Sequence, residues 1–465
     1  MQSPPTLRAV LALTVLTFGL ALQLQAQTFT DLVNIQSKTG ADPAAALIQG
    51  LDGNFYGTAV NNGLYDGGSA FRLTQQGKLG AFYSFCQVGN CTPAGFAPFA
   101  GLVQSSNGTF YGTTLEGGAN SDGTVFKLAP NGTITTLHNF SGTDGASPQS
   151  GLLLASDGNF YGTTQSGGTF NFGTVFKITP GGTFTSLHSF NETDGKSPIG
   201  GMVQAANGFL YGTTDIGGAI GSGTVFKITT SGALTTVHNF GDTDGSIPLG
   251  ALILGSDNNI YGTTEAGGAN NYGTVFNVTP SGTFTTLYNF NFGDGAYPEA
   301  GLIQANDGNY YGITTWGGSG GTCFDGCGTV FEITPAGTLT TLHDFTGPDG
   351  YQPMGSLMQS TTGTFYGTTW YGGADFGTIF SLSTGLGAFV KPQPAFGKAG
   401  ASVIILGNNL TGTTSVMFNG TAATFTVVSA TEINATVPPG ATSGTVQVTT
   451  PTGTLKSNPI FHVVP

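Results

Sequence analysis

Two tryptophans stand out as candidate ligand-binding residues. Trp316 and Trp370 are the only tryptophans in the chain, and each follows a short strand-like segment at the start of a glycine-rich loop. Tyr371 adjoins one of them, and Asp325 and Asp375 lie further along the same two loops. Aromatic rings can stack on the C–H faces of sugars, while carboxylates accept hydrogen bonds from sugar hydroxyls. These five residues therefore predict a carbohydrate-binding patch, with ordinary loop packing as the alternative.

Asp-Gly pairs recur along the chain and suggest another kind of site. Asp242 and Asp244 alternate in an Asp-Thr-Asp-Gly sequence, as the first carboxylates of a calcium-binding loop do. The later glutamate that completes an EF-hand is missing, and Asp-Gly is also a common turn sequence. We expect structural turns at these pairs, with calcium at Asp242 and Asp244 as the alternative and no other cofactor. The recurring pairs begin at Asp144, Asp194, Asp244, Asp294 and Asp349.

The four cysteines form two close pairs, Cys86 with Cys91 and Cys323 with Cys327. Each pair lies in a stretch where the internal repeat described below lengthens from 50 to 55 residues. Short disulfides that pin these longer loops suit an exported protein. A zinc site made from all four thiolates is the alternative, although no histidine lies nearby. The sequence therefore predicts two local disulfides.

Residues able to catalyse a reaction are sparse. Glycoside hydrolysis needs two carboxylates at a defined separation, whereas Glu116, Glu265 and Glu299 are scattered along the chain. No metal-ligand cluster or phosphate-binding loop is present in the sequence. We therefore identify no catalytic residue and favour a protein that is not an enzyme.

Four histidines recur at one position of the repeat and raise the question of a metal ring. Tyr83 and Tyr288 take the same position in other repeats. A position that accepts such different bulky residues is typical of packing, and side chains on equivalent outer strands would lie far apart. We expect these histidines to pack rather than to bind metal. They are His138, His188, His238 and His343.

A tandem repeat must position all of these residues. Seven copies of aromatic-Tyr-Gly-x-Thr, or a close variant, occur with spacings of 55, 50, 50, 50, 50 and 55 residues. One copy shows strand-like segments at 251–254, 259–264, 273–278 and 283–290. Small four-stranded sheets can bury both faces by packing around an axis. The sequence thus predicts an all-β, seven-bladed β-propeller in which the repeated tyrosines pack between blades. They are Tyr56, Tyr111, Tyr161, Tyr211, Tyr261, Tyr311 and Tyr366.

The start of the mature chain favours a closed ring. Seven copies of the third strand are followed by only six copies of the fourth. Residues 28–34 match the fourth strand at 183–189, so this N-terminal strand would complete the last blade. Closure of this kind removes exposed strand edges. An open β-solenoid is the alternative, and it would not need the displaced strand.

The predicted strand order also sorts the loops between two faces of the disk. Loops from second to third strands share one face with the connections from each blade to the next. The Gly-Gly loops, both cysteine pairs and the Asp-Gly pairs all fall on this face. Because function concentrates on variable loops over a rigid scaffold, we expect any binding site there.

A second domain is predicted after the repeats. Residues 391–394, Lys-Pro-Gln-Pro, are typical of a linker, and short alternating strands separated by Gly, Pro and Asn turns follow them. Residues 403–410, 416–420 and 437–440 resemble segments of IPT/TIG domains. The resemblance implies an immunoglobulin-like β-sandwich over 391–465, which leaves 27–390 for the propeller.

The repeats resemble the GloVer type of bacterial tandem repeat over about residues 40–385. The likeness rests on Gly-Leu-Val and its variants, Tyr-Gly-Thr-Thr, Gly-Gly and Gly-Thr-Val-Phe. It implies an exported bacterial protein and supplies no catalytic residue. Gly-Leu-Val and its variants begin at Gly101, Gly151 and Gly301, and Gly-Thr-Val-Phe begins at Gly173, Gly223 and Gly273.

Composition and the first residues indicate export. Arg8 precedes an apolar run from Ala9 to Leu22, so residues 1–26 are predicted to be a cleaved signal peptide. The run is shorter than the ~20 residues that span a bilayer, and an uncleaved anchor is the alternative. Lys and Arg total 11 against 24 Asp and Glu, which argues against nucleic-acid binding. We expect no membrane insertion after cleavage.

These features together predict a secreted, non-enzymatic binding or interaction protein, located outside the cell, in the periplasm or at the cell surface. The expected partner is a carbohydrate or a surface protein. A secreted polysaccharide-active hydrolase or lyase is one alternative, and a purely structural component of the cell envelope is another.

Overall fold

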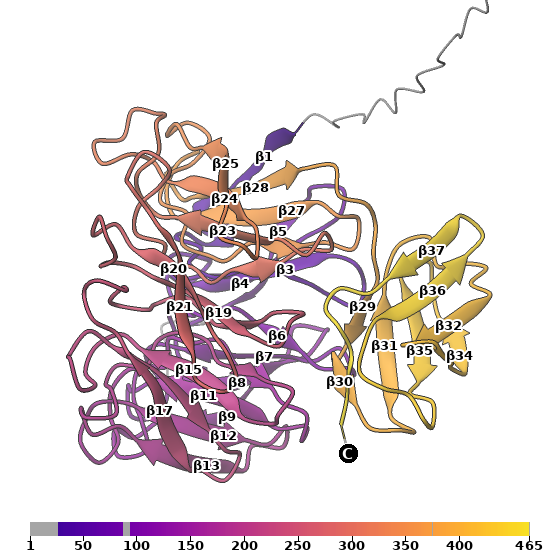
Figure 1. The fold of residues 1–465 in the computed structure, drawn as a ribbon, viewed down its shortest axis with the longest axis horizontal. Helices are drawn as coiled ribbons and strands as arrows, with labels where there is room; N and C mark the ends of the chain where they lie inside the picture. The colour runs from indigo at the N-terminus through magenta and orange to yellow at the C-terminus, as the bar shows by residue number, and fades with distance from the viewer. Residues whose placement is uncertain (1–26, 87–93, 374, 465) are drawn as a thin grey trace, which may run out of the picture.

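The computed structural model describes residues 27–86, 94–373 and 375–464, and Figure 1 shows an almost entirely β-stranded chain. The 3-10 turn η1 (Ser37–Thr39) is the sole helical element among these residues. None of them forms a helix long and apolar enough to cross a membrane. The predicted all-β class is confirmed. The predicted signal peptide, residues 1–26, lies outside the described residues.

The tandem repeat folds into four-stranded antiparallel sheets of constant strand order. Seven such sheets lie between residues 28 and 383 of the described chain. In the repeat at residues 251–290, the observed strands begin and end within two residues of the segments expected from the sequence.

The first strands are β2 (Ile48–Gln49), β6 (Val103–Gln104), β10 (Leu153–Leu154), β14 (Val203–Gln204), β18 (Ile253–Leu254), β22 (Ile303–Gln304) and β26 (Met358–Gln359). The second strands are β3 (Phe55–Ala59), β7 (Phe110–Thr114), β11 (Phe160–Thr164), β15 (Leu210–Thr214), β19 (Ile260–Thr264), β23 (Tyr310–Thr314) and β27 (Phe365–Thr369). The third strands are β4 (Ser69–Leu73), β8 (Thr124–Leu128), β12 (Thr174–Ile178), β16 (Thr224–Ile228), β20 (Thr274–Val278), β24 (Thr329–Ile333) and β28 (Thr378–Ser383). The outer strands are β5 (Leu79–Ser84), β9 (Ile134–Asn139), β13 (Phe184–Ser189), β17 (Leu234–Asn239), β21 (Phe284–Asn289), β25 (Leu339–Asp344) and β1 (Thr28–Asn34).

The last sheet takes its outer strand from the start of the chain. β1 pairs antiparallel with β28 along its length. Its Phe29 stacks on His343 of the preceding sheet, with ring centroids 3.7 Å apart, and on Phe380 of β28 at 5.3 Å. The strand predicted at 28–34 is therefore confirmed, and it packs against two sheets at once.

The repeated Tyr-Gly segment follows from close packing within each sheet. A Cβ atom added at Gly212 would come 2.5 Å from Phe226 Cζ and 3.1 Å from Met202 Cγ. Glycine thus leaves room for a third-strand phenyl ring directly against the second strand. The hydroxyls of Thr214 and Thr224, both fully buried, share a hydrogen bond of 2.9 Å across the same pair of strands.

The repeated tyrosines join each sheet to the next. Tyr111 is buried and stacks on Phe160 of the following sheet, with ring centroids 4.1 Å apart. Tyr366 of the last sheet lies 4.3 Å from Phe55 of the first. Aromatic packing therefore runs through the repeats and returns from the last sheet to the first. The predicted packing role of these tyrosines is confirmed.

Residues beyond the repeats form a second all-β part with its own core. Buried Val403, Val416, Ile433 and Val448 belong to one hydrophobic cluster that both of its main sheets share. One sheet contains, in order, β29 (Lys391–Gln393), β31 (Ser402–Leu406), β35 (Glu432–Thr436) and β34 (Phe425–Val427). The other contains β33 (Thr421–Ala422), β32 (Ser415–Phe418), β36 (Val446–Thr450) and β37 (Gly453–Lys456). β30 (Phe396–Gly397) pairs with β38 (His462–Val463).

The segment expected to be a linker is instead a strand. β29 pairs with β31, and Pro392 lies opposite Ile405. Proline cannot donate a backbone hydrogen bond, but an edge strand tolerates it because one side of that strand needs no partner. β29 is such an edge strand. The Lys-Pro-Gln-Pro sequence therefore begins the C-terminal part, and its prolines are misleading.

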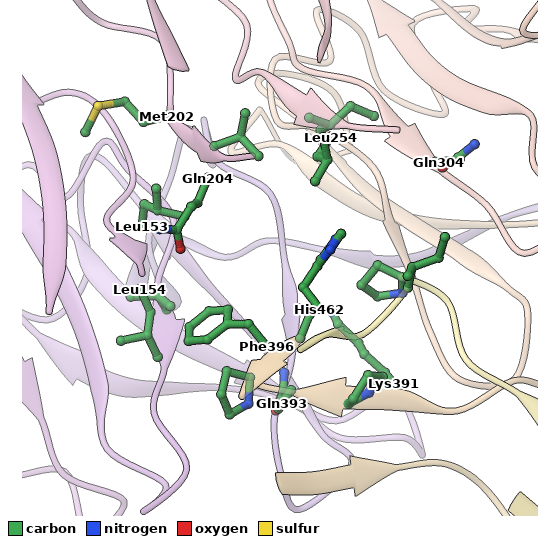
Figure 2. A pocket seen from close by; sticks show the side chains of 18 of the residues that line it. Leu153, Leu154, Met202, Gln204, Leu254, Gln304, Lys391, Gln393, Phe396 and His462 are labelled. Atoms are coloured by element: carbon green, nitrogen blue, oxygen red, sulfur yellow. The ribbon is translucent and has the colours of Figure 1, made fainter. Parts of the chain in front are cut away.

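The C-terminal part lies against one end of the repeats (Figure 1). Asn458 Nδ2 donates to the carbonyl of Gln304 at 2.8 Å, and Asn408 Nδ2 donates to Thr361 Oγ1 at 2.7 Å. Gln304 and Thr361 lie where first strands lead into second strands. The C-terminal part thus covers the face opposite the second-to-third loops, and Figure 2 shows the cavity that lies between the two parts.

Candidate functional site

A cavity of about 410 Å3, here called the axial cavity, opens on the loop face of the repeats. Each of the seven repeats contributes the residue that follows a repeated proline, so equivalent positions surround one axis. Side chains can vary there on a constant backbone, as functional sites often require. The equivalent residues are Ala44, Phe99, Gln149, Ile199, Leu249, Glu299 and Met354.

In each repeat, a backbone hydrogen bond positions a second residue next to the one that lines the axial cavity. The residue after each second strand donates its N–H to the residue before the repeated proline. Glu265 donates to Ile247 at 2.9 Å, and Trp370 donates to Gln352 at 3.0 Å. Both are thereby positioned next to the mouth of the axial cavity. The residues at this position are Val60, Leu115, Gln165, Asp215, Glu265, Thr315 and Trp370.

Glu299 lines the axial cavity, and the charge of Glu265, which does not line it, acts on both Glu299 and Asp215. Burial, reinforced by the negative charge of Glu265, raises the pKa of Glu299 to about 7. Burial also raises the pKa of Asp215 to about 6, with a smaller contribution from Glu265. One oxygen of Asp215, Oδ1, is buried and lacks a hydrogen-bond partner within the described chain. Carboxyl groups whose pKa lies near neutrality can exchange protons with a bound ligand.

Aromatic side chains lead outward from another part of the axial cavity. Phe99 lines the cavity, and its ring centroid lies 6.2 Å from that of Trp370. Trp370 lies 6.3 Å from Tyr371, whose ring stacks on Tyr351 at 5.2 Å. These four rings form an aromatic row across the loop face. Such a row offers extended apolar contact area at low cost in side-chain entropy.

The aromatic row ends at a surface hollow of about 450 Å3, here called the outer hollow. Trp316 and Tyr351 line it, and Phe324 contributes a fully exposed ring. Cys323 also lines the outer hollow, so the local disulfide shapes its wall. The hollow can accommodate a flat apolar face and leaves its rim open to solvent.

Of the five residues predicted to bind sugar, Trp316 alone is among those that line the axial cavity or the outer hollow. Trp370 lies in the row that begins at the axial cavity, Trp316 lines the outer hollow, and Tyr371 lies between them. Asp325 and Asp375 are exposed on the adjoining loops. The role of all five as ligand contacts stays a prediction.

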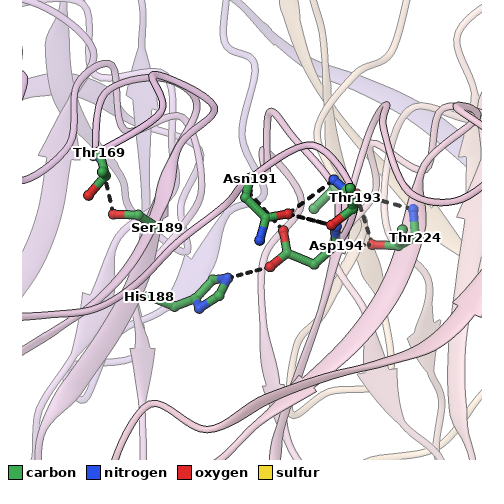
Figure 3. Close-up of polar contacts among 8 residues, drawn as sticks. Thr169, His188, Ser189, Asn191, Thr193, Asp194 and Thr224 are labelled. Atoms are coloured by element: carbon green, nitrogen blue, oxygen red, sulfur yellow. Dashed lines mark hydrogen bonds and ion pairs between the residues drawn. The ribbon is translucent and has the colours of Figure 1, made fainter.

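The Asp-Gly pairs anchor the connections between sheets, as Figure 3 shows for Asp194. One carboxylate oxygen lies 2.9 Å from His188 Nε2, and the other accepts the Asn191 N–H at 3.0 Å. Three more repeats contain the same His–Asp contact, at 3.0, 3.0 and 2.9 Å. The histidines therefore fix the turns by hydrogen bonding as well as by packing.

The candidate calcium residues take part in similar contacts. Asp244 lies 3.0 Å from His238 Nε2 and accepts the Gly241 N–H at 2.8 Å. Asp242 accepts a hydrogen bond from Ser222 at 3.1 Å. Across the described ranges, no group of three or more His, Cys, Asp or Glu is placed to hold a metal. This geometry favours the turn role, and calcium at Asp242 and Asp244 stays a prediction.

The disulfide between Cys323 and Cys327 is confirmed, with an S–S distance of 2.00 Å and a Cα–Cα distance of 5.3 Å. These two sulfurs are consequently not available as zinc ligands. Cys91, the predicted partner of Cys86, lies outside the described residues, so that pairing stays a prediction.

Glu265 and Glu299 were set aside as scattered in the sequence, and Asp215 was not singled out. Glu265 and Glu299 are separated by 34 positions and belong to different repeats, yet their charges interact in the structure. Glu116, the third glutamate considered, is exposed in another repeat. Comparing the residue that follows the repeated proline across all seven repeats would have pointed to Glu299. The comparison shows Glu299 where the other repeats have apolar residues or glutamine.

Known proteins match the chain in sequence and in fold. The family model described as the Gloeobacter/Verrucomicrobia repeat matches residues 89–256 and 245–428. No curated protein sequence matches the chain. The fold is similar to that of virginiamycin B lyase from Staphylococcus aureus, at 15% identity and a TM-score of 0.52, over 77% of this chain and 99% of that one.

Two further solved structures are similar over most of the chain. One is a fungal alcohol oxidase of the AA5 family, at 15% identity and a TM-score of 0.55, over 92% of this chain and 98% of that one. The other is the extracellular domain of a hybrid two-component system from B. thetaiotaomicron, at 10% identity and a TM-score of 0.52, over 93% and 54%. Identities this low indicate the fold alone. The chain therefore belongs to the Gloeobacter/Verrucomicrobia repeat family and has a β-propeller-like fold.

Proposed function

We propose that this chain is an exported, non-enzymatic binding protein whose contact face is the loop face of a closed, seven-bladed β-propeller. Three features support closure: the strand exchange of β1, the contact of Tyr366 with Phe55, and the axial cavity that seven repeats line. The disulfide at Cys323 supports an oxidising compartment outside the cytoplasm. The propeller would comprise residues 27–390.

The C-terminal part would be an IPT/TIG-like, immunoglobulin-like sandwich over 391–465 that acts as a spacer or docking module. Its two four-stranded sheets around one core support this assignment. Because it covers the face opposite the loops, it leaves the proposed contact face open.

The proposed ligand is a carbohydrate chain. The observation that carries this proposal is the aromatic row that connects the axial cavity to the outer hollow, with Phe99 at one end and Tyr351 at the other. Glu299 lines another part of the axial cavity, and Trp316 lines the outer hollow. Rings can stack on successive sugar faces, and the carboxylates accept hydrogen bonds from hydroxyls. Two separate hollows suit a chain of several sugars better than a single sugar.

A secreted polysaccharide hydrolase or lyase is the second candidate, and Glu299 of the axial cavity favours it. Glu299, with a pKa near 7, could donate a proton while Glu265 or Asp215 acts as base or nucleophile. The aromatic row would then hold the chain on which these groups act.

A polysaccharide screen separates these candidates. Purified protein is incubated with soluble polysaccharides, and both binding and new reducing ends are measured. Binding without new ends supports the binding protein, whereas new ends that disappear in Glu299→Gln support the hydrolase. A lyase would also produce unsaturated ends that absorb in the ultraviolet. Absence of both binding and cleavage across acidic, neutral and basic polysaccharides would contradict the carbohydrate proposal.

A further inference from the structure

A second cavity, of about 460 Å3, lies between the repeats and the C-terminal part. We call it the interface cavity. Inner strands of the repeats form one wall, and residues of β29, β30 and β38 form the other (Figure 2). Leu152 and Met202 line both this cavity and the axial cavity. The two cavities therefore occupy opposite ends of one axis.

The wall of the interface cavity is mainly apolar. Leu153, Leu154 and Leu254 line it from the repeats, and Phe396 and Ile460 line it from the C-terminal part. Its volume falls within the ~300–1,000 Å3 typical of small-molecule sites. An aliphatic chain of moderate length would thus find apolar contacts on both sides.

Polar groups without partners face this apolar wall. In the described chain, the Lys391 ammonium has no hydrogen bond or ion pair, and burial lowers its pKa. Gln393 Oε1 is buried and also lacks a hydrogen-bond partner. His462 lines the same cavity, where burial lowers its pKa as well. Groups left in this state cost free energy unless a ligand satisfies them.

The charge of the lining is unusual for this chain. Lys391 and His462 line the interface cavity, and no Asp or Glu does so among the described residues. The whole chain has 24 acidic residues against 11 Lys and Arg. An acid-free pocket with a half-buried lysine favours an anionic head group, which would form a charge-assisted hydrogen bond with the ammonium.

We propose that the interface cavity binds a small amphipathic carboxylate, an aliphatic acid whose chain lies along Leu153, Leu154 and Leu254 and whose head group pairs with Lys391. His462 can donate a ring N–H to the same carboxylate, and Gln393 can do so only through its amide N–H2 group, because its Oε1 is itself an acceptor. The ligand would contact both the repeats and the C-terminal part, so its binding stabilises the contact between them. This site is independent of the carbohydrate proposed for the loop face.

Isothermal titration into the full chain tests the proposal with three probes. Decanoate has both chain and charge, decanol has the chain without the charge, and acetate has the charge without the chain. We expect decanoate to bind one-to-one and about tenfold or more tighter than decanol, because a hydrogen bond to a charged group is lost with the alcohol. Acetate should show no measurable binding over the same range.

Matched variants assign the binding to the interface cavity. Lys391→Met keeps an unbranched apolar side chain and should weaken decanoate about tenfold or more while leaving decanol unchanged. Lys456→Met removes an exposed lysine of the same part and serves as the control. Ala395→Phe, which adds bulk to the cavity wall, should weaken both long-chain probes. Circular dichroism and thermal unfolding establish that each variant is folded.

Failure of decanoate to bind the folded wild-type chain would overturn the proposal. Equal weakening of decanoate by Lys391→Met and Lys456→Met would do so too, since binding would then reflect general charge attraction. Tighter binding of decanol than of decanoate would overturn the assigned role of the lysine.

Discussion

The two ends of the repeat axis have opposite chemistry on one scaffold. The axial cavity is lined by Glu299, on which the charge of Glu265 acts, and opens toward the aromatic row, whereas the interface cavity is apolar, carries Lys391 and is covered by the C-terminal part. Leu152 and Met202 line both cavities. The constant strands of the repeat therefore determine neither the acidic nor the basic character of these cavities. Side chains that vary between repeats supply the carboxylates and aromatic rings of the loop end, and the C-terminal part supplies the lysine of the other end.

Removal of the strand that completes the last sheet should have the largest effect on both ends. Deletion of residues 28–34 leaves β28 without its partner and removes the Phe29 contacts with His343 and Phe380. We expect a loss of ~5 kcal/mol or more, because a large aromatic residue and a whole row of backbone pairing disappear. Thermal unfolding measures this loss, and ligand binding should fail at both ends.

Thr30→Ala serves as the control for the deletion, since Thr30 is an exposed residue of the same strand and should change stability little. A deleted chain that unfolds at the wild-type temperature would indicate an open array that does not depend on β1.

Glu299→Gln tests the acidic end alone. Burial and Glu265 raise the pKa of Glu299 from 4.5 to about 7, so the folded state binds more protons than the unfolded state between these values. Wild-type stability therefore falls as pH rises through this range. The variant should gain ~2–3 kcal/mol relative to wild type at pH 8 and nothing at pH 4. Urea unfolding at both pH values measures the difference.

Glu116→Gln provides the matched control for Glu299→Gln, because Glu116 is exposed. Decanoate affinity should stay the same in Glu299→Gln, which sharpens the separation of the two ends. A gain of equal size at pH 4 and pH 8 would contradict the protonation account.

Gly212→Ala tests the wall that the two ends share. The added methyl group meets Phe226 and Met202 at 2.5 and 3.1 Å, and overpacking of this kind typically costs ~1–3 kcal/mol. Because Met202 lines both cavities, ligands of both ends should bind more weakly. Gly80→Ala is the control, since nothing lies within 4 Å of an added Cβ there. Equal stability of both variants would show that the repeated glycine is not a packing requirement.

Asp349→Asn tests a carboxylate at the periphery of the loop face, and its pH dependence should have the opposite sign. Burial raises the pKa of Asp349, but hydrogen bonds from His343 and Thr346 outweigh it and leave the pKa below 3.8. Wild-type stability from this group is present above pH 3.8 and is lost as pH falls through the lowered pKa. We expect the variant to lose ~1 kcal/mol at pH 7 and less at pH 3.

Asp325→Asn is the control for this smallest effect, since Asp325 is exposed. Chemical denaturation at pH 7 and pH 3 provides the measurement. A loss for Asp349→Asn that grows on acidification would contradict the assignment of its hydrogen bonds.

Most of the scaffold could be predicted because one pattern determines it many times over. The spacing of the tyrosines and the match of residues 28–34 to an outer strand give the sheets and the exchange of β1. The strand at 391–393 could not be predicted in this way. Its prolines are compatible with either a linker or an edge strand, and only pairing with β31 decides between them.

Some aromatic residues of the candidate site could be identified from the sequence, but its interacting carboxylates could not. The tryptophans lie on the face that carries the two hollows, since Trp316 lines the outer hollow and Trp370 contacts Phe99 of the axial cavity, and their role as ligand contacts stays a prediction. Glu265 and Glu299 were set aside because they lie far apart in the sequence, and their charges interact only once neighbouring repeats pack together. Residues from different repeats share no local spacing signal. The sequence pattern therefore does not reveal which residues the packing of the repeats brings close together.

One titration series tests whether the loop face binds a carbohydrate chain along its aromatic row. The best polysaccharide from the screen is titrated into wild type, Trp370→Ala and Phe170→Ala, a variant of an exposed aromatic residue in another repeat. We predict that Trp370→Ala weakens binding about tenfold or more and that Phe170→Ala leaves it unchanged. Unchanged affinity in Trp370→Ala, in a folded protein, would contradict the account.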